Sequence, residues 1–146
     1  MLSDSLKILY GTTFVFFAKT FGFHHNVEGE NFPQYHKFLD DMYVEIYESL
    51  DKIAEHIRTL GSYSPGSLQR MLELSMIKEQ TKIPRAELMV EELLADNEKL
   101  LSMWKEAFSV AEQENEQGIA NFIAERIDAH GKHGWMLRSI LKKDRA

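Results

Sequence analysis

The chain has 146 residues, of which 44% are hydrophobic and 27% charged, a composition that fits one globular domain spanning residues 1–146. Its formal net charge of −6 disfavours polyanionic partners, and the one basic cluster consists of Lys142, Lys143 and Arg145. The absence of cysteine excludes disulfide frameworks, thiolate zinc sites and a cysteine nucleophile, and is compatible with a cytoplasmic location.

The first predicted helix runs from about Ser3 to His25. Its inward-facing residues recur at steps of three and four, which is the period of one helix face: Leu6, Leu9, Tyr10, Thr13, Phe16, Phe17 and Thr20. The apolar stretch at residues 12–18 is too short to span a bilayer and lacks the flanking features of a signal peptide. We therefore expect a helix buried in protein and no membrane contact.

The remaining elements are also predicted to be helical. The second helix runs from about Pro33 to Leu60, after a break at Gly29. A short helix from Ser67 to Met76 is expected inside a long connection, followed by long helices from Pro84 to about Ala111 and from roughly Gly118 to Lys142. No segment alternates with period two, so the sequence predicts an all-α protein, a ferritin-like four-helix bundle with a short extra helix in the crossover.

Two stripes of side chains run along the second predicted helix. One is apolar and is expected to face the bundle core: Leu39, Met42, Tyr43, Ile46, Leu50, Ile53, Ile57 and Leu60. The other lies beside it at steps of three or four and carries ionisable groups: His36, Asp40, Val44, Tyr47, Asp51 and Glu55. Asp51 and Glu55 repel each other, and either solvent with neighbouring bases or a shared cation such as Fe(II) offsets that repulsion.

The spacing along this helix limits how a metal site is built. His36 and Asp51 lie about 22 Å apart at 1.5 Å rise per residue, so they cannot bind one metal ion within one chain. His24 is expected near His36 because a short turn joins the first two helices. If these residues share a site, the histidines of one subunit must meet the carboxylates of another. An antiparallel pairing across a two-fold axis achieves this and creates two equal sites per dimer.

Two segments carry a specific pattern of residues. The first reads His24-His25-Asn26-Val27, with Gly29, Phe32 and His36, followed by Asp51-x-x-Ala54-Glu55. The second reads His130-Gly131-Lys132-x-x-Trp135-Met136-Leu137-Arg138. Together with the helix lengths and the long crossover, these segments resemble the Dps family of mini-ferritins over nearly the whole chain.

The resemblance implies a ferroxidase centre between two subunits, in which two histidines face an aspartate and a glutamate. By motif, these metal-binding residues are His24, His36, Asp51 and Glu55. The family assembles as a shell of twelve subunits, oxidises Fe(II) preferably with hydrogen peroxide, and stores ferric iron, which protects against oxidative damage. The alternative is a similar shell that sequesters metal or shields DNA without significant ferroxidase activity. From the net charge, we expect weak or no DNA binding.

Two further residues are candidates for the metal site. Asp40, with Asp41, falls where the family carries mineral-nucleating carboxylates, and an ordinary solvated acidic face is an equal alternative. Asp40 is also placed to hydrogen-bond a ligand histidine. His25 stands where the family usually has tryptophan, and it is a spare metal ligand, a proton carrier or a surface histidine.

Other histidines and both tryptophans receive structural interpretations. His130 and His133 are expected to serve in packing, and His56 is expected to be a surface residue. Trp104 and Trp135 are expected in the core or at an interface.

Overall fold

The computed structural model describes residues 1–142, so Lys143 and Arg145 of the predicted basic cluster lie outside the described residues. Five helices and no strand occupy the described part: α1 (Leu2–Asn26), α2 (Phe32–Thr59), α3 (Leu68–Leu74), α4 (Ala86–Gln113) and α5 (Gln117–Leu141). The predicted all-α architecture is confirmed, including the short helix in the crossover. Within these residues, none of the helices is long and apolar enough to cross a membrane.

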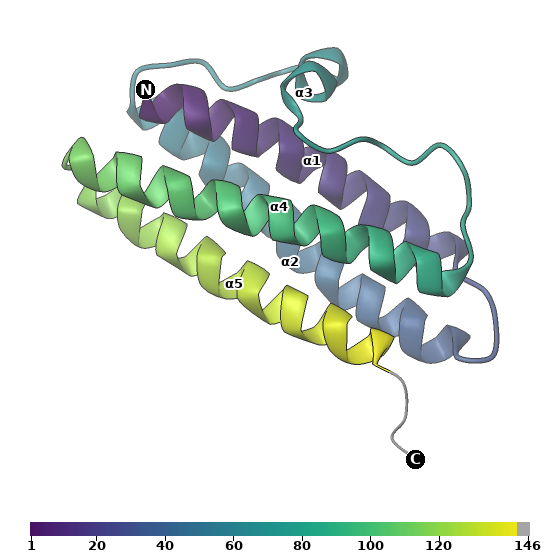
Figure 1. Cartoon of the computed structure of the whole chain (residues 1–146). Coiled ribbons are helices and arrows are strands. Elements are labelled where there is room, and N and C mark those ends of the chain that lie inside the picture. The colour runs from purple at the N-terminus through teal and green to yellow at the C-terminus, as the bar shows by residue number, and fades with distance from the viewer. Residues whose placement is uncertain (143–146) are drawn as a thin grey trace.

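The four long helices lie side by side as two antiparallel pairs (Figure 1). Helices α1 and α2 form one hairpin, and α4 and α5 form the other. The crossover that carries α3 runs back along the bundle, so α4 begins at the end where α2 begins. Helix α1 packs against both α2 and α4, α4 packs against α5, and α3 packs against α1. This arrangement is the ferritin-like bundle that the helix lengths predict.

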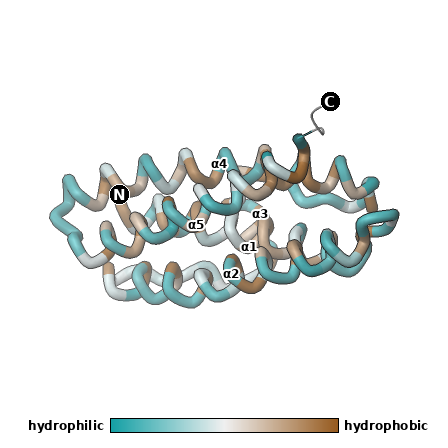
Figure 2. Tube along the Cα trace, turned by 90° about the horizontal axis from the view of Figure 1, so that it is seen from below, coloured by the Kyte–Doolittle hydropathy of each residue, from teal (hydrophilic) through white to brown (hydrophobic). Residues whose placement is uncertain are grey.

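The predicted apolar stripes form the bundle core. The buried apolar residues on α2 are Leu39, Met42, Ile46, Leu50, Ile53 and Ile57. Trp104 of α4 is fully buried against Phe122, with 6.0 Å between ring centroids, whereas Trp135 of α5 is 60% exposed. Figure 2 shows hydrophilic and hydrophobic residues alternating along the long helices, as expected for helices with one buried face.

Proline and serine mark the helix starts in two different ways. Pro33 lies in the first turn of α2, where its missing N–H costs no intrahelical bond. Ser67 caps α3, because its hydroxyl oxygen accepts a hydrogen bond from the Arg70 N–H at 3.1 Å.

The start of α4 differs from the prediction. The sequence analysis predicts a long helix that begins at Pro84, but α4 begins at Ala86. Arg85 has extended backbone angles and forms the N-cap instead.

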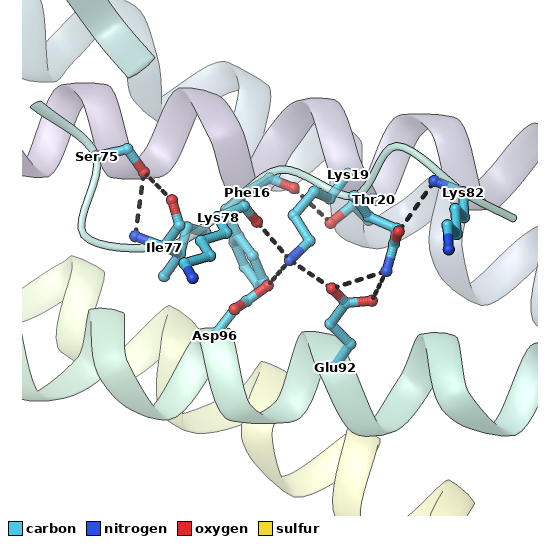
Figure 3. Close-up of polar contacts among 10 residues, drawn as sticks. Phe16, Lys19, Thr20, Ser75, Ile77, Lys78, Lys82, Glu92 and Asp96 are labelled. Atoms are coloured by element: carbon cyan, nitrogen blue, oxygen red, sulfur yellow. Dashed lines mark hydrogen bonds and ion pairs between the residues drawn. The ribbon is translucent and has the colours of Figure 1, made fainter. Parts of the chain in front are cut away.

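A buried lysine of α1 forms polar contacts with both α4 and the crossover. Lys19 of α1 is 6% exposed, and its Nζ lies 3.1 Å from Glu92 Oε1 and 2.6 Å from Asp96 Oδ2 of α4 (Figure 3). The same Nζ donates a hydrogen bond to the Lys78 carbonyl of the crossover at 2.9 Å. Burial raises the pKa of Asp96, and the Lys19 ammonium opposes that rise. One cation therefore joins α1, α4 and the crossover.

Gly11 allows α3 to approach α1 closely. A Cβ at this position would lie 2.7 Å from the Met71 carbonyl oxygen and 2.9 Å from the Leu74 Cβ. Beside it, the Thr12 hydroxyl accepts a hydrogen bond from the Met76 N–H at 3.0 Å. The contact between the crossover and α1 therefore depends on the missing side chain at Gly11.

We predict that Gly11→Ala lowers the free energy of unfolding by about 1–3 kcal/mol, because the added methyl group overlaps the Met71 backbone. Urea and thermal unfolding followed by circular dichroism measure the change. Gly22→Ala is the matched control on the same helix, because a Cβ at Gly22 meets nothing within 4 Å. That control should stabilise the protein by up to about 1 kcal/mol. Equal effects of the two substitutions would contradict the close approach.

Candidate metal centre

The two histidines expected in one half of the site lie together within one chain. His24, near the end of α1, and His36, in the second turn of α2, are stacked with ring centroids 3.9 Å apart and 16° between the planes. Each ring Nδ1 lies 2.8 Å from the backbone carbonyl oxygen of the other histidine. Because a carbonyl oxygen only accepts, both Nδ1 atoms donate. In the neutral rings, the Nε2 lone pairs then remain for a metal ion.

A short turn between α1 and α2 produces this stack. Gly29 adopts a φ of +120°, which L side chains rarely adopt, and its carbonyl accepts a hydrogen bond from the Phe32 N–H at 3.1 Å. Val27 anchors the turn in the core with 2% exposure. The Phe32 ring stacks on the His36 ring, with 5.1 Å between centroids. The motif residues of this turn therefore serve to position the histidine pair.

Three further side chains surround the histidine pair. The exposed His25 ring stands edge-on to the His24 ring, with 4.9 Å between centroids. The Tyr43 ring lies 5.3 Å from the His24 ring. Burial raises the pKa of Tyr43, and the charge and hydrogen bond of Asp40 raise it further. The Asp40 charge thus acts on Tyr43, and the histidine Nδ1 atoms already donate to backbone carbonyls.

The expected carboxylates lie in another part of the molecule. Asp51 and Glu55 are exposed on α2, and Asp51 lies about 22 Å from His36 at 1.5 Å rise per residue. Residues 1–142 contain no group of three or more His, Cys, Asp or Glu side chains that could hold a metal ion. The structure therefore brings His24 and His36 together and leaves the carboxylate pair apart from them.

Asp41 has a partner of its own. Its carboxylate forms an exposed ion pair with Lys37 at 2.7 Å, one turn earlier on α2. The hydrogen bond and charge of Asp41 raise the pKa of Lys37. For Asp41, this pairing favours the solvated acidic face over a role in mineral nucleation.

A second polar cluster joins α2, α4 and α5 inside the bundle. Glu45 binds the Arg126 guanidinium through both carboxylate oxygens and accepts a hydrogen bond from His133 Nε2 at 2.7 Å. His130 is fully buried, and its Nδ1 donates to Asn97 Oδ1 at 2.8 Å. Its Nε2 accepts from Arg126 at 3.2 Å. The predicted packing role of His130 and His133 is confirmed.

The charges of this cluster are set by burial and by partners. Burial and the Arg126 charge hold the pKa of His130 well below its ordinary value, so that ring is neutral. Burial alone would raise the pKa of Glu45, but the bonds from His133 and Arg126 lower it to about 2. Sequence reasoning missed Glu45 because its partners lie 81 and 88 residues away. In the sequence, the one local indication of this polar cluster was the four-residue spacing between Arg126 and His130.

His56 differs from its expected position at the surface. Its ring packs on Phe122 with 4.8 Å between centroids, and desolvation lowers its pKa. The reason is helical spacing, because residue 56 lies three positions after Ile53 and next to Ile57, both fully buried. His56 is therefore a half-buried residue at the edge of the core stripe.

Comparisons with known proteins agree with this fold. The ferritin-like domain family model matches residues 4–146. The DNA protection during starvation protein of Helicobacter pylori is 30% identical over 139 residues, covering 94% of this chain and 96% of its own length. The crystal structure of Dps from Staphylococcus aureus superposes with a TM-score of 0.94 and 29% identity, covering 98% of this chain and 96% of that one.

A Dps protein from Vibrio cholerae, described as a member of a broad superfamily of ferritin-like diiron-carboxylate proteins, gives a TM-score of 0.93. It is 26% identical, with 97% of this chain and 89% of that chain covered. These similarities extend over nearly the full length of each protein. The chain belongs to the Dps family of ferritin-like proteins.

We predict that Glu45→Gln lowers the free energy of unfolding at pH 7 by about 2 kcal/mol, because Arg126 loses its charged partner. The loss stays below the 3–5 kcal/mol typical of fully buried pairs, since the Glu45 side chain is 38% exposed. Asp41→Asn, which disrupts the exposed pair with Lys37, is the matched control and should cost less than about 1 kcal/mol.

Urea unfolding at several pH values measures both effects. The folded-state pKa of Glu45 is lowered from 4.5 to about 2, so its stabilisation is present above pH 4.5 and is lost as the pH falls toward 2. The difference between the parent and Glu45→Gln should narrow over that interval. A difference that stays constant would show that the charge of Glu45 is not its cause.

Proposed function

We propose that this protein is a ferroxidase and iron-storage protein, acting at centres shared by two subunits of a twelve-subunit shell. It would oxidise Fe(II) with hydrogen peroxide, keep the ferric product inside the shell, and so protect the cell against oxidative damage. The observation that carries the proposal is the stacked pair of His24 and His36, whose Nδ1 atoms both donate to backbone carbonyls. Membership in the Dps family supports it.

The chemistry of the side chains suits iron as the substrate. Imidazole nitrogen and carboxylate oxygen are ligands that Fe(II) accepts, and the carboxylates neutralise the charge added when Fe(II) becomes Fe(III). The carbonyls bonded to Nδ1 hold the imidazole rings in place and raise their basicity as ligands. Each peroxide takes one electron from each of two Fe(II) ions, takes up two protons, and becomes two molecules of water.

The shared centre follows from the rigidity of α2. One subunit would supply His24 and His36, and the second would supply Asp51 and Glu55, in an antiparallel pairing about a two-fold axis. Each dimer then holds two equal centres. Assembly is thus a requirement for the chemistry, because neither half holds enough ligands alone.

His25 and Asp40 are proposed as peripheral metal-binding residues of the same centre. His25 stands edge-on to His24, and Asp40 lies one helical turn after His36 on α2. We further propose weak or no DNA binding, since each subunit carries a formal charge of −6. A cytoplasmic location is proposed from the absence of cysteine.

We predict that Glu55→Ala slows Fe(II) oxidation at least about tenfold while the shell stays intact, because the centre loses one carboxylate ligand. Fe(II) is added anaerobically to purified protein, followed by peroxide, and ferric absorbance and particle size are recorded together. Glu48→Ala, a second exposed carboxylate on α2, is the matched control and should oxidise iron at the parental rate. Unchanged oxidation by Glu55→Ala would refute the assignment, and an inactive parent would indicate a shell that only sequesters metal.

We predict that two slowed variants, His36→Ala and Glu55→Ala, regain activity when their subunits are mixed. In a mixed dimer of His36→Ala and Glu55→Ala subunits, one centre carries both changes and the other carries neither. Random reassembly after unfolding should return about a quarter of the parental oxidation rate, because half of the dimers are mixed and each has one intact centre of two. Activity no higher than that of either variant alone would contradict the shared centre.

A further inference from the structure

The buried imidazole of His130 has contacts on both ring nitrogens, and together they fix where its single proton lies. Arg126 Nη2 lies 3.2 Å from Nε2, and a guanidinium only donates, so Nε2 must keep its lone pair. On the other side, Asn97 donates its amide N–H to the His130 backbone carbonyl at 2.9 Å, which turns its Oδ1 toward Nδ1 at 2.8 Å. Nδ1 therefore carries the proton, and both contacts require a neutral ring.

The nitrogen that binds His130 also joins α5 to α2. Arg126 Nη2 carries two hydrogens, of which one points to His130 Nε2 and the other to Glu45 Oε1 of α2 at 3.1 Å. A proton added to Nε2 would meet this N–H and would place two cations side by side in the buried interior. Arg126 would then have to move, and Glu45 would lose its donor. Protonation of His130 is thus coupled to the contact between α2 and α5.

Each of the four long helices contributes to the surroundings of His130: Phe16 from α1, Glu45 from α2, Asn97 from α4, and Arg126 and His133 from α5. Burial and the charges of Arg126 and His133 lower the pKa of His130, whereas Glu45 opposes them. His133 differs, because its Nε2–H donates to Glu45 whether its ring is neutral or charged. Of the two histidines, His130 is therefore the one whose protonation breaks a contact.

A cleft between α2 and α5 brings solvent to this cluster. Within residues 1–142, the closely packed pairs of long helices are α1–α2, α1–α4 and α4–α5, so α2 and α5 meet across a wider gap. The cleft has a volume of about 210 Å³, which is enough to hold water. Its walls include Phe38, Met42 and Glu45 of α2 and Ala129, His133 and Met136 of α5. We call these two walls the α2–α5 seam.

We propose that the α2–α5 seam is an acid-sensitive latch, in which protonation of His130 releases Arg126 from Glu45 and lets α5 separate from α2 along the cleft. The latch goes beyond the proposed function, because none of these three residues is a proposed metal ligand. The α2 wall begins at Phe38, two residues after His36. Opening of the seam therefore loosens the part of the bundle that carries the histidine pair.

The pH range of the latch follows from the direction of the pKa shift. The pKa of His130 is lowered in the folded protein, so its stabilising effect is present above the ordinary value of 6.5 and is lost as the pH falls below it. The pKa of Glu45 is lowered from 4.5 to about 2, so the contribution of Glu45 is lost only below pH 4.5. Between pH 6.5 and 4.5, opening of the seam therefore reports on His130.

The test measures hydrogen–deuterium exchange by mass spectrometry on the purified parent protein at pH 7 and pH 5, corrected for the intrinsic exchange rate. His130→Gln keeps an oxygen acceptor for Arg126, and His130→Asn keeps an N–H donor for Asn97. Neither side chain titrates, and one folded variant is enough for the comparison. His56→Gln is the matched control, because His56 also has a lowered pKa but packs on Phe122, away from the seam.

We expect the opening constant of amides 126–137 to rise about 25-fold from pH 7 to pH 5 in the parent, as for uptake of one proton with an ordinary pKa of 6.5. His56→Gln should show the same rise, whereas His130→Gln and His130→Asn should show less than about a twofold rise. Amides 5–12 of α1 are the internal reference and should stay constant. A parent without the rise, a His130 variant that retains it, or an equal rise at the reference amides overturns the latch.

Discussion

Helix α2 is one continuous helix of 28 residues, with His36 near its beginning and Asp51 and Glu55 in its second half. Because the helix is rigid, His36 stays about 22 Å from Asp51, and farther from Glu55, whatever the loops do. The histidine half is held equally firmly, since each Nδ1 of the stacked pair donates to the other residue's carbonyl. The proposed chemistry rests on these two facts, because a centre that combines the histidines with the carboxylates would need a second subunit.

The interior of the bundle is held in register by polar contacts as well as by apolar packing. Lys19 joins α1, α4 and the crossover, while Glu45 joins α2 to Arg126 and His133 of α5. Apolar contacts are non-directional, whereas a buried charge without its partner is costly. Each of these clusters therefore favours one relative position of the helices it joins, and that position sets where the histidine pair and the carboxylate pair lie.

The amino-acid sequence by itself determined the helices, the core stripes and the separation of His36 from Asp51 and Glu55 along α2. These features depend on local periodicity and on residue spacing within one helix, so they follow from the order of residues alone. The stacking of His24 on His36 was anticipated only as proximity, because ring orientation depends on the turn at Gly29.

Only the tertiary structure decided the position of Lys19, the partners of Glu45 and the half-burial of His56. Each of these depends on contacts between side chains of different helices that lie more than thirty residues apart in the sequence. No periodic pattern records such contacts, because the relative rotation and translation of packed helices is set by all of the side chains between them.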